Sequence, residues 1–202
     1  MRREGLKALA RGLARLAVMP IVASYRVRSL LAPEQAFRSS SQLLSLFPGM
    51  SGDYLRREFY RLVLPHCAKS AQICFGTIFS SAAARVGENV YIGAYCIIGN
   101  ATIERDVLVG SGVHLLSGKH QHGIGDIRQR IREQPRTLER ISIGEDTWIG
   151  DSATVMANVG RKCVIGAGSV VASEIPECSI AAGNPAKVLS ARRQKLQEEL
   201  RG

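Results

Sequence analysis

One feature constrains this chain more than any other: an aliphatic residue followed by glycine recurs at intervals of six residues. The pairs stand at Val86-Gly87, Ile92-Gly93, Ile98-Gly99 and Val109-Gly110, and again at Ile143-Gly144, Ile149-Gly150, Val159-Gly160 and Ile165-Gly166. The step of six is interrupted twice, by a gap of eleven before Val109, which is six plus five through Ile103, and by a slip before Val159. A period of six matches neither a helix nor a simple strand. It is typical of a short strand plus a tight turn, stacked coil upon coil as a solenoid.

Three such units would close a triangular coil of about eighteen residues, by the logic of stacked repeats. We expect the aliphatic residue to point inward and the glycine after it to turn the chain, often with positive φ. Small residues two places before the next aliphatic, such as Cys96, Thr102, Ala153 and Ser169, should also fit inside. A core of Val and Ile agrees with an aromatic content of only 5%.

Three segments lie outside the repeats. Residues 1–32 read as a helix that Pro20 kinks or ends. One face of it carries leucines, and the opposite face carries basic residues: Leu6, Leu9, Leu13 and Leu16 against Arg3, Lys7, Arg11 and Arg15. Residues 51–64 predict a second helix, capped by Ser51 or Asp53.

The predicted organisation therefore has three parts: a helical region over 1–69, a β-solenoid over 70–185 and a charged C-terminal helix over 186–202. A polar excursion at 116–140 interrupts the solenoid with the segment SGKHQHG.

Charge and cysteine content exclude several classes of function. The net charge is +10, but +6 of it lies in residues 1–38 and +3 in residues 187–202, so the body is near neutral. Without a basic, aromatic face on that body, we expect no nucleic-acid binding. The cysteines are odd in number and form no CxxC pair, so they predict buried, reduced thiols and no zinc site: Cys67, Cys74, Cys96, Cys163 and Cys178.

The chain resembles the hexapeptide-repeat acyltransferases in its repeats, in the excursion with SGKHQHG, and in the segments ISIGEDTWIGD, VIGAGSVV and AAGNPAKVL that follow it in this order. The closest branch contains the maltose, galactoside and polysaccharide O-acetyltransferases, and the resemblance covers roughly residues 70–190. It implies a left-handed parallel β-helix, a homotrimer, acetyl-CoA as donor, no metal, and active sites between subunits.

The resemblance also assigns roles to residues. The general base of the family falls on His120, with His122 as the alternative, and a neutral imidazole can take a proton from an attacking hydroxyl. Trp148 matches the tryptophan that lines the acceptor or pantetheine site, or else packs as an outward side chain. The positions that contact CoA fall on Asp151, Ala167 and Ala172.

The phosphate contacts depart from the family pattern. Relatives often have Thr-Lys where this chain has Ala172-Ser173, and an arginine where it has Ser190. Lys187, or Arg192 and Arg193, are the basic residues that could replace them. A solvated helix face is the alternative for these charges.

We therefore expect an acetyl-CoA-dependent O-acetyltransferase that modifies a sugar hydroxyl, in surface polysaccharide or a lipid-linked glycan. The alternatives are a serine O-acetyltransferase, an amino-sugar N-acetyltransferase or a non-catalytic β-helix scaffold.

The N-terminal helix suggests a location. Its longest charge-free apolar run, Leu16 to Tyr25, spans ten residues. A membrane-spanning helix needs about twenty, so we expect no transmembrane span. Leucines opposite basic residues are typical of a helix that lies on a membrane surface. We expect a cytoplasmic protein, with residues 1–32 as a peripheral contact to the inner face of the membrane; the alternatives are a helix packed on the solenoid and a secretory signal peptide.

Overall fold

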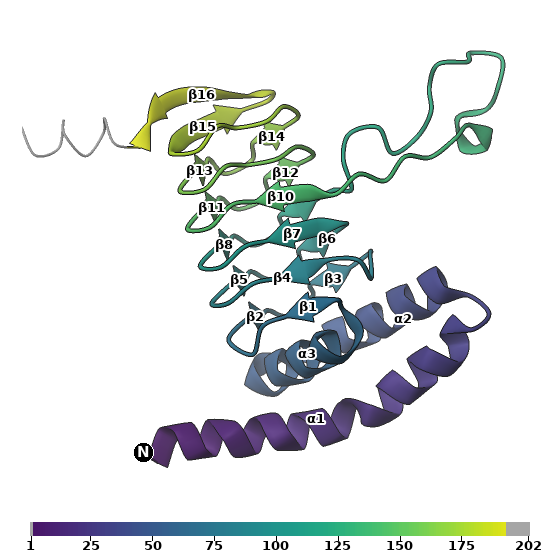
Figure 1. The fold of residues 1–202 in the computed structure, drawn as a ribbon, viewed down its shortest axis with the longest axis vertical. Helices are drawn as coiled ribbons and strands as arrows, with labels where there is room; N and C mark the ends of the chain where they lie inside the picture. The colour runs from purple at the N-terminus through teal and green to yellow at the C-terminus, as the bar shows by residue number, and fades with distance from the viewer. Residues whose placement is uncertain (1, 193–202) are drawn as a thin grey trace, which may run out of the picture.

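A cap of three helices covers one end of a stack of triangular coils (Figure 1). The computed structural model describes residues 2–192. The cap comprises α1 (Arg2–Ser29), α2 (Pro33–Ser45) and α3 (Gly49–Val63), and the coils begin at His66. The predicted solenoid with an N-terminal helical extension is confirmed, although it begins four residues before the expected position 70.

Short parallel strands form the three faces of the stack. The first sheet comprises β1 (His66–Cys67), β4 (Arg85–Val86), β7 (Ala101–Ile103) and β10 (Ile141–Ile143). The second comprises β2 (Gln72–Ile73), β5 (Tyr91–Ile92), β8 (Leu108–Val109), β11 (Trp148–Ile149), β13 (Val164–Ile165), β15 (Ser179–Gly183) and β16 (Ala186–Ala191). The third comprises β3 (Ile78–Phe79), β6 (Ile97–Ile98), β9 (His114–Leu115), β12 (Thr154–Val155) and β14 (Val170–Val171). The chain climbs from the first sheet to the second and third with a left-handed sense, as predicted (Figure 1).

The interior of the stack is the predicted aliphatic ladder. Ile92, Val109 and Ile149 have no exposed surface and stack in register across β5, β8 and β11. Burying each such side chain contributes about 1.5–3 kcal/mol. Of the small residues expected inside, Cys96, Ala153 and Ser169 are buried.

The prediction for Thr102 is wrong, because the residue two places before the inward Ile103 is Ala101 and not Thr102. Thr102 pairs with Arg85 and Ser142 in the outward row of the first sheet, and Ala101 is buried instead. The three-residue strand β7 points its first and third side chains inward.

The glycines of the repeats act differently from our expectation. The positive φ angles occur two residues later, at positions such as Asn89, Tyr95 and Ser152. Glycine is needed at the corner because the next coil lies so close. A Cβ at Gly93 would approach the backbone nitrogen of Ser111 to 2.6 Å. The repeat therefore requires glycine for close approach between coils, not for backbone conformation.

The outward-facing side chains of the first and second sheets differ in chemistry. The row on the first sheet is polar and includes Arg85, Thr102 and Ser142. The row on the second sheet carries Tyr91, Leu108 and Trp148 in register, all exposed.

The cap has an aromatic core. Phe37, Phe59 and Tyr60 are buried, and the Tyr60 ring lies 4.3 Å from the ring of Phe79 in the first coil. These contacts fix the cap on the end of the stack.

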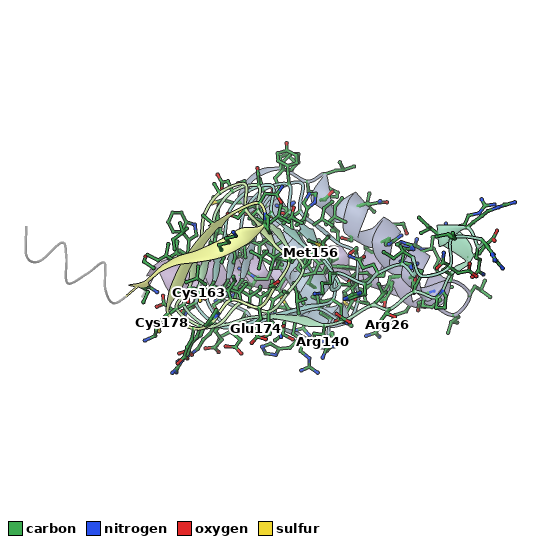
Figure 2. All side chains as sticks on the ribbon, turned by 90° about the horizontal axis from the view of Figure 1, so that it is seen from above. Arg26, Arg140, Met156, Cys163, Glu174 and Cys178 are labelled. Atoms are coloured by element: carbon green, nitrogen blue, oxygen red, sulfur yellow. The ribbon has the colours of Figure 1, made fainter. Side chains whose placement is uncertain are left out.

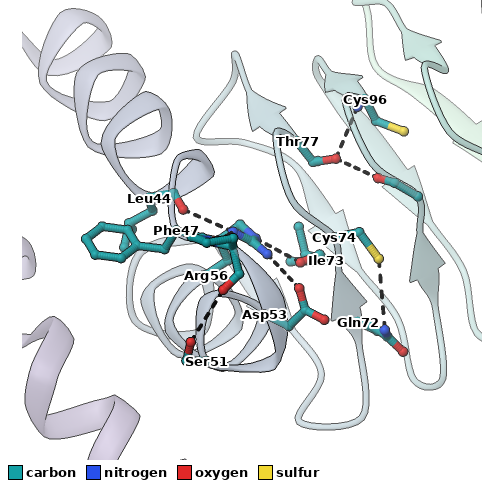
Figure 3. A network of polar contacts seen from close by, with 12 residues as sticks. Leu44, Phe47, Ser51, Asp53, Arg56, Gln72, Ile73, Cys74, Thr77 and Cys96 are labelled. Carbon is teal, nitrogen blue, oxygen red and sulfur yellow. Dashed lines mark hydrogen bonds and ion pairs between the residues drawn. The ribbon is translucent and has the colours of Figure 1, made fainter.

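A buried arginine joins both parts (Figure 3). Arg56 donates from Nε to the carbonyl of Ile73 at 2.9 Å, and from Nη1 to the carbonyls of Leu44 and Phe47. Its Nη2 lies 2.6 Å from Oδ1 of Asp53. Every acceptor of this guanidinium except the carboxylate is a main-chain group of α2, its following loop or β2.

Several helix predictions need correction. Helix α3 begins at Gly49 with Pro48 as its N-cap, so neither Ser51 nor Asp53 caps it; Asp53 binds Arg56 instead. Of the two alternatives for Pro20, an end of the helix is wrong and a kink fits, because α1 continues through Pro20 and bends in its second half (Figure 1). Helix α2 was not predicted, although Pro33 at its start and Glu34 in its first turn are helix-start signals.

The segment after residue 185 also differs from its predicted structure. Ala186–Ala191 was expected to begin the C-terminal helix, but it forms β16, which pairs antiparallel with β15. The strand covers the edge that the last coil would otherwise expose. The charged residues that suggested a helix begin only at Arg192, and residues 193–202 lie outside the described part of the chain.

Candidate active site

The two candidate histidines lie at the start of the excursion, which occupies residues 116–140 as predicted, between β9 and β10. His120 and His122 are both exposed. No hydrogen bond to either imidazole is found among residues 2–192. Both rings are therefore accessible to a substrate.

The base of the excursion is fixed to the rigid coils. The Glu139 amide donates to the carbonyl of Ser117 at 3.0 Å, which closes the loop at its root. Ser117 is buried, and its hydroxyl accepts from the amide of Asn100 at 2.9 Å. His120, three residues from Ser117, is therefore held more closely than the tip of the loop.

Within the excursion, a buried glutamine organises the chain. The side-chain nitrogen of Gln134 donates to the carbonyls of Asp126 and Gln129, at 2.9 and 3.0 Å. The amide of Gly123 donates to the carbonyl of Pro135. Sequence reasoning missed Gln134, because a single polar residue in a polar loop carries no distinguishing pattern.

Two hollows flank the histidine segment. The one nearer the cap, about 180 Å³, is lined by α1 and α2, by the coil around Ser80 and by the excursion, with Glu34, Arg38, Gln121 and Arg136 among its polar residues. The one farther from the cap, about 190 Å³, is lined by Lys119, Arg140, Ala172 and Ser173, among others. His120 and His122 line neither hollow, but Lys119 and Gln121, the neighbours of His120 in sequence, line one each, so this segment lies between the two hollows.

Of the predicted CoA contacts, only Ala172 lies beside the histidine segment. Asp151 and Ala167 occupy the corner after the second sheet, in successive coils. Asp151 has a structural bond there, because its Oδ1 accepts from the amide of Ser111 at 2.8 Å.

Trp148 and Lys187 lie on the second sheet, opposite the corner from which the excursion leaves. Trp148 is 54% exposed and lines a separate hollow with Leu108, Cys163 and Arg192. Figure 2, seen along the stack, shows Cys163 and Cys178 on one side and the excursion projecting from the other. One chain therefore does not bring Trp148 to His120.

The basic candidates for phosphate binding are placed differently from one another. Arg192 pairs with Asp146 at 3.2 Å and also donates to the carbonyl of Lys162. Lys187 is exposed on β16. Arg193 lies outside the described residues.

The cysteines do not supply a nucleophile near the histidines. Burial raises the pKa of the Cys163 thiol, which lies next to Trp148, and raises that of Cys67 to about 12. Cys67, Cys96 and Cys163 are buried as predicted, whereas Cys74 and Cys178 are half-buried. Among the described residues, no cluster of three or more His, Cys, Asp or Glu is arranged to hold a metal ion.

Known proteins resemble this chain in its coils. The model of the bacterial transferase hexapeptide (six repeats) matches residues 83–117, and the model of the hexapeptide repeat of succinyl-transferase matches residues 140–173. The "Putative lipopolysaccharide biosynthesis O-acetyl transferase WbbJ" of Escherichia coli K12 is 36% identical over 121 residues. That match covers 56% of this chain and 60% of the relative, which is less than two thirds of its length.

Solved structures share the fold. A maltose O-acetyltransferase from Clostridium difficile 630 superposes with a TM-score of 0.69 at 23% identity, covering 80% of this chain and 88% of that one. A galactoside acetyltransferase in complex with coenzyme A gives a TM-score of 0.67 at 24% identity, covering 81% and 86%. The two matched segments both lie in the coils, so the solenoid of this chain is similar in sequence to the hexapeptide repeats of bacterial transferases and shares the fold of these solved structures.

Proposed function

We propose that this protein is an acetyl-CoA-dependent O-acetyltransferase that modifies a sugar hydroxyl, in surface polysaccharide or a lipid-linked glycan. One observation carries the proposal: the His120 segment is fixed to the coils and separates two hollows. A transferase needs such an arrangement, because donor and acceptor must approach one base from two sides.

In this proposal, the acceptor hydroxyl oxygen attacks the carbonyl carbon of the acetyl thioester while the His120 imidazole takes the hydroxyl proton. The tetrahedral intermediate then collapses, the carbon–sulfur bond breaks, and the imidazolium returns the proton to the departing thiolate. The products are an acetyl ester and the free thiol of CoA. Histidine suits both transfers, because an imidazole can accept a proton and its imidazolium can return it near neutral pH.

The donor is assigned to the hollow farther from the cap. Ala172 lies there, as the resemblance implies, and its small side chain leaves room beside the coil. Lys119 is exposed at the same hollow and gives a positive charge for a CoA phosphate. Lys119 supplements Lys187 as a candidate, because Arg192 is already paired with Asp146.

The acceptor is assigned to the hollow nearer the cap. Its lining includes carboxylate, guanidinium and amide groups from Glu34, Arg38, Gln121 and Arg136. Such groups form paired hydrogen bonds with the hydroxyls of a sugar. The Glu34 and Arg38 side chains come from α2, so the helical cap would take part in acceptor recognition.

We further propose a homotrimer whose copies share each site. Ile124, Ile127 and Ile131 are exposed on the excursion, which projects away from the coils of its own chain (Figure 1). Another copy would bury these side chains, and its second sheet would bring Trp148 to His120. Light scattering should then give about three times the 21.9 kDa chain mass.

The base is tested by His120→Ala, with His122→Ala as the matched control. We expect a loss of about 10²–10⁴ in rate for His120→Ala. The assay is CoA release with a panel of sugars, amino sugars and serine. Activity lost only in His122→Ala would reassign the base, preference for serine or an amino sugar would change the acceptor class, and no turnover with any acceptor would favour the scaffold.

The shared site is tested by complementation. His120→Ala and Trp148→Ala chains are refolded together, because a mixed trimer then contains some sites with both residues intact. Activity above that of either variant alone supports a site between copies. If mixing restores nothing while both single variants are inactive, each site lies within one chain.

A further inference from the structure

Helix α1 turns an apolar side away from the rest of the protein. Ala14, Val18 and Val22 are the buried positions of the helix, packed against α2 and α3. The opposite side, half a helical turn away, carries leucines. Leu13 and Leu16 on that side are 60% and 70% exposed.

This apolar side is continuous and long. It runs from Leu9, 60% exposed, to Val27, 67% exposed. It extends past the end of the helix to Leu30 and Leu31, which are 83% and 92% exposed. Figure 1 shows α1 across the end of the molecule, with α2 and α3 between it and the coils. An unbroken apolar strip on an outer surface marks an interaction site.

A basic cluster lies on the other side of α1. Two adjoining hollows where α1 meets α3 and the first coil are lined by Arg11, Arg15, Arg57, Arg61 and Lys69. The acidic residues of these hollows are already paired: Glu58 with Arg61 at 2.8 Å and with Arg57 at 3.5 Å, and Asp53 with Arg56. Arg11, Arg15 and Lys69 therefore leave this junction positively charged.

We propose that α1 lies in the plane of an anionic phospholipid bilayer, with the side defined by Leu9, Leu13, Leu16, Val27, Leu30 and Leu31 inserted among the acyl chains. The exposed basic residues of the cluster then face the headgroup phosphates. An apolar side with Lys and Arg on the opposite side is the composition of interfacial helices. A second copy fits less well, because it would cover the apolar side and leave the basic cluster without a partner.

Helix α1 also contains the stretch Ala8–Ser29, which by length and composition alone could cross a membrane, with a mean hydropathy of 1.2. This finding differs from our expectation from the sequence, because the charged residues lie toward the two ends of the stretch, Arg11 and Arg15 at one end and Arg26 and Arg28 at the other. If α1 crossed the bilayer, Ala14, Val18 and Val22 would be separated from α2 and α3. An in-plane helix keeps that packing and leaves the arginines in the headgroup region.

The test is flotation of the full-length protein with phosphatidylcholine vesicles that contain or lack phosphatidylglycerol, at about 50 mM and 500 mM NaCl. We expect binding to the anionic vesicles that weakens with salt. Leu13→Gln with Leu16→Gln should reduce it at least about tenfold, because the apolar insertion is lost. The matched control is Val188→Gln with Leu189→Gln, an exposed apolar pair on β16 that should leave binding unchanged.

The basic cluster has its own variants. Arg15→Gln with Lys69→Gln should weaken binding about fivefold per charge and flatten the salt dependence. The matched control is Arg128→Gln with Arg130→Gln on the excursion, where both side chains are also exposed. All these side chains lie at the surface, so circular dichroism and melting curves should stay unchanged.

Three results would overturn the proposal: no binding by the unaltered protein, equal binding by the Leu13/Leu16 variant, or retention on membranes through an alkaline carbonate wash, which indicates a spanning helix. A change of oligomeric mass in the Leu13/Leu16 variant, with vesicle binding unaltered, would assign the strip to a second copy. None of these readouts depends on acetyl transfer.

Discussion

The helical cap and the coil stack are stabilised in opposite ways. The coils repeat one contact many times, so that Ile92, Val109 and Ile149 each pack on equivalents above and below. The cap has a single aromatic core and one buried arginine, and neither has an equivalent elsewhere in it. A repeat distributes its stability over neighbouring units, whereas an irregular core depends on individual residues.

The distribution of aromatic residues shows the same contrast. Tyr91, Tyr95 and Trp148 are the aromatic residues that follow Phe79, and the rest of them occur between Tyr25 and Phe79. All three are exposed to some degree, with Tyr95 at 62%. In the first coil Phe79 is buried against Tyr60 of the cap, whereas in the later coils the interior holds aliphatic and small side chains and the rings lie on the outside.

The largest loss of stability is expected for a substitution in the helical cap. Arg56→Met keeps the length of the side chain but leaves three main-chain carbonyls and Asp53 without their donor. Breaking a buried, hydrogen-bonded charge pair costs about 3–5 kcal/mol. Urea unfolding measures the loss, and hydrogen exchange should show it first in α2 and α3. A loss spread evenly over the coils would contradict the division between the two regions.

A smaller effect on stability is expected for glycine-to-alanine substitutions, one in the coil stack and one in the helical cap. Gly93→Ala places a Cβ 2.6 Å from the backbone of the next coil, which should cost about 1–3 kcal/mol through overpacking. Gly12→Ala in α1 meets no atom within 4 Å, so it should stabilise the protein by about 0.5–1 kcal/mol through helix propensity. Thermal unfolding of both variants checks the opposite signs.

Where the cap meets the first coil, loss of one buried hydrogen bond should lower the stability less. Tyr60→Phe removes a hydroxyl that lies 2.7 Å from the Ser41 hydroxyl, which itself accepts from the amide of Phe79. Burial raises the pKa of Tyr60, so the phenol stays protonated across the stable pH range. We expect a loss of about 1 kcal/mol. Ser41→Ala should cost more, because it leaves two buried groups unpaired; a smaller loss there would mean that the joint does not depend on this hydroxyl.

The smallest effect is expected for a second arginine–carboxylate pair. Arg105 lies 2.8 Å from Glu145 on the outside of the coils, and hydrogen bonding to Arg105 lowers the pKa of the Glu145 carboxyl. Because this pKa is lower in the folded than in the unfolded protein, the ionised carboxyl stabilises the fold at pH values above its unfolded-state pKa. That contribution is lost as the pH falls through the folded-state pKa. Arg105 is exposed and Glu145 is half-buried at the surface, so Arg105→Ala should return the pKa toward its ordinary value, seen by NMR, with at most a small change in stability.

The sequence predicted the coils well because their signal is local and repeated. Each corner glycine is required by the next coil, so the period of six reveals the stacking directly. The helical cap carries a weaker signal. The buried side of α1 consists of Ala14, Val18 and Val22, which are smaller than the leucines that periodicity would select.

The candidate site divides in the same way. The segment around His120 was located by its motif, as was the excursion at 116–140. The placement of Trp148 on the opposite face depends on how the coils close in space, which its spacing from His120 does not reveal. The hollow nearer the cap joins Glu34 and Arg136, which are far apart along the chain.

The sequence by itself determined the left-handed stack, through the resemblance of its repeats, and it determined the inward ladder through the period of its aliphatic residues. Only the tertiary structure decided which side of α1 is free, where Arg56 finds its acceptors, and how α2 reaches the base of the excursion. The physical reason is the range of the contacts. A coil packs on the next coil about eighteen residues away, whereas the cap and the site join segments with no fixed separation in the chain.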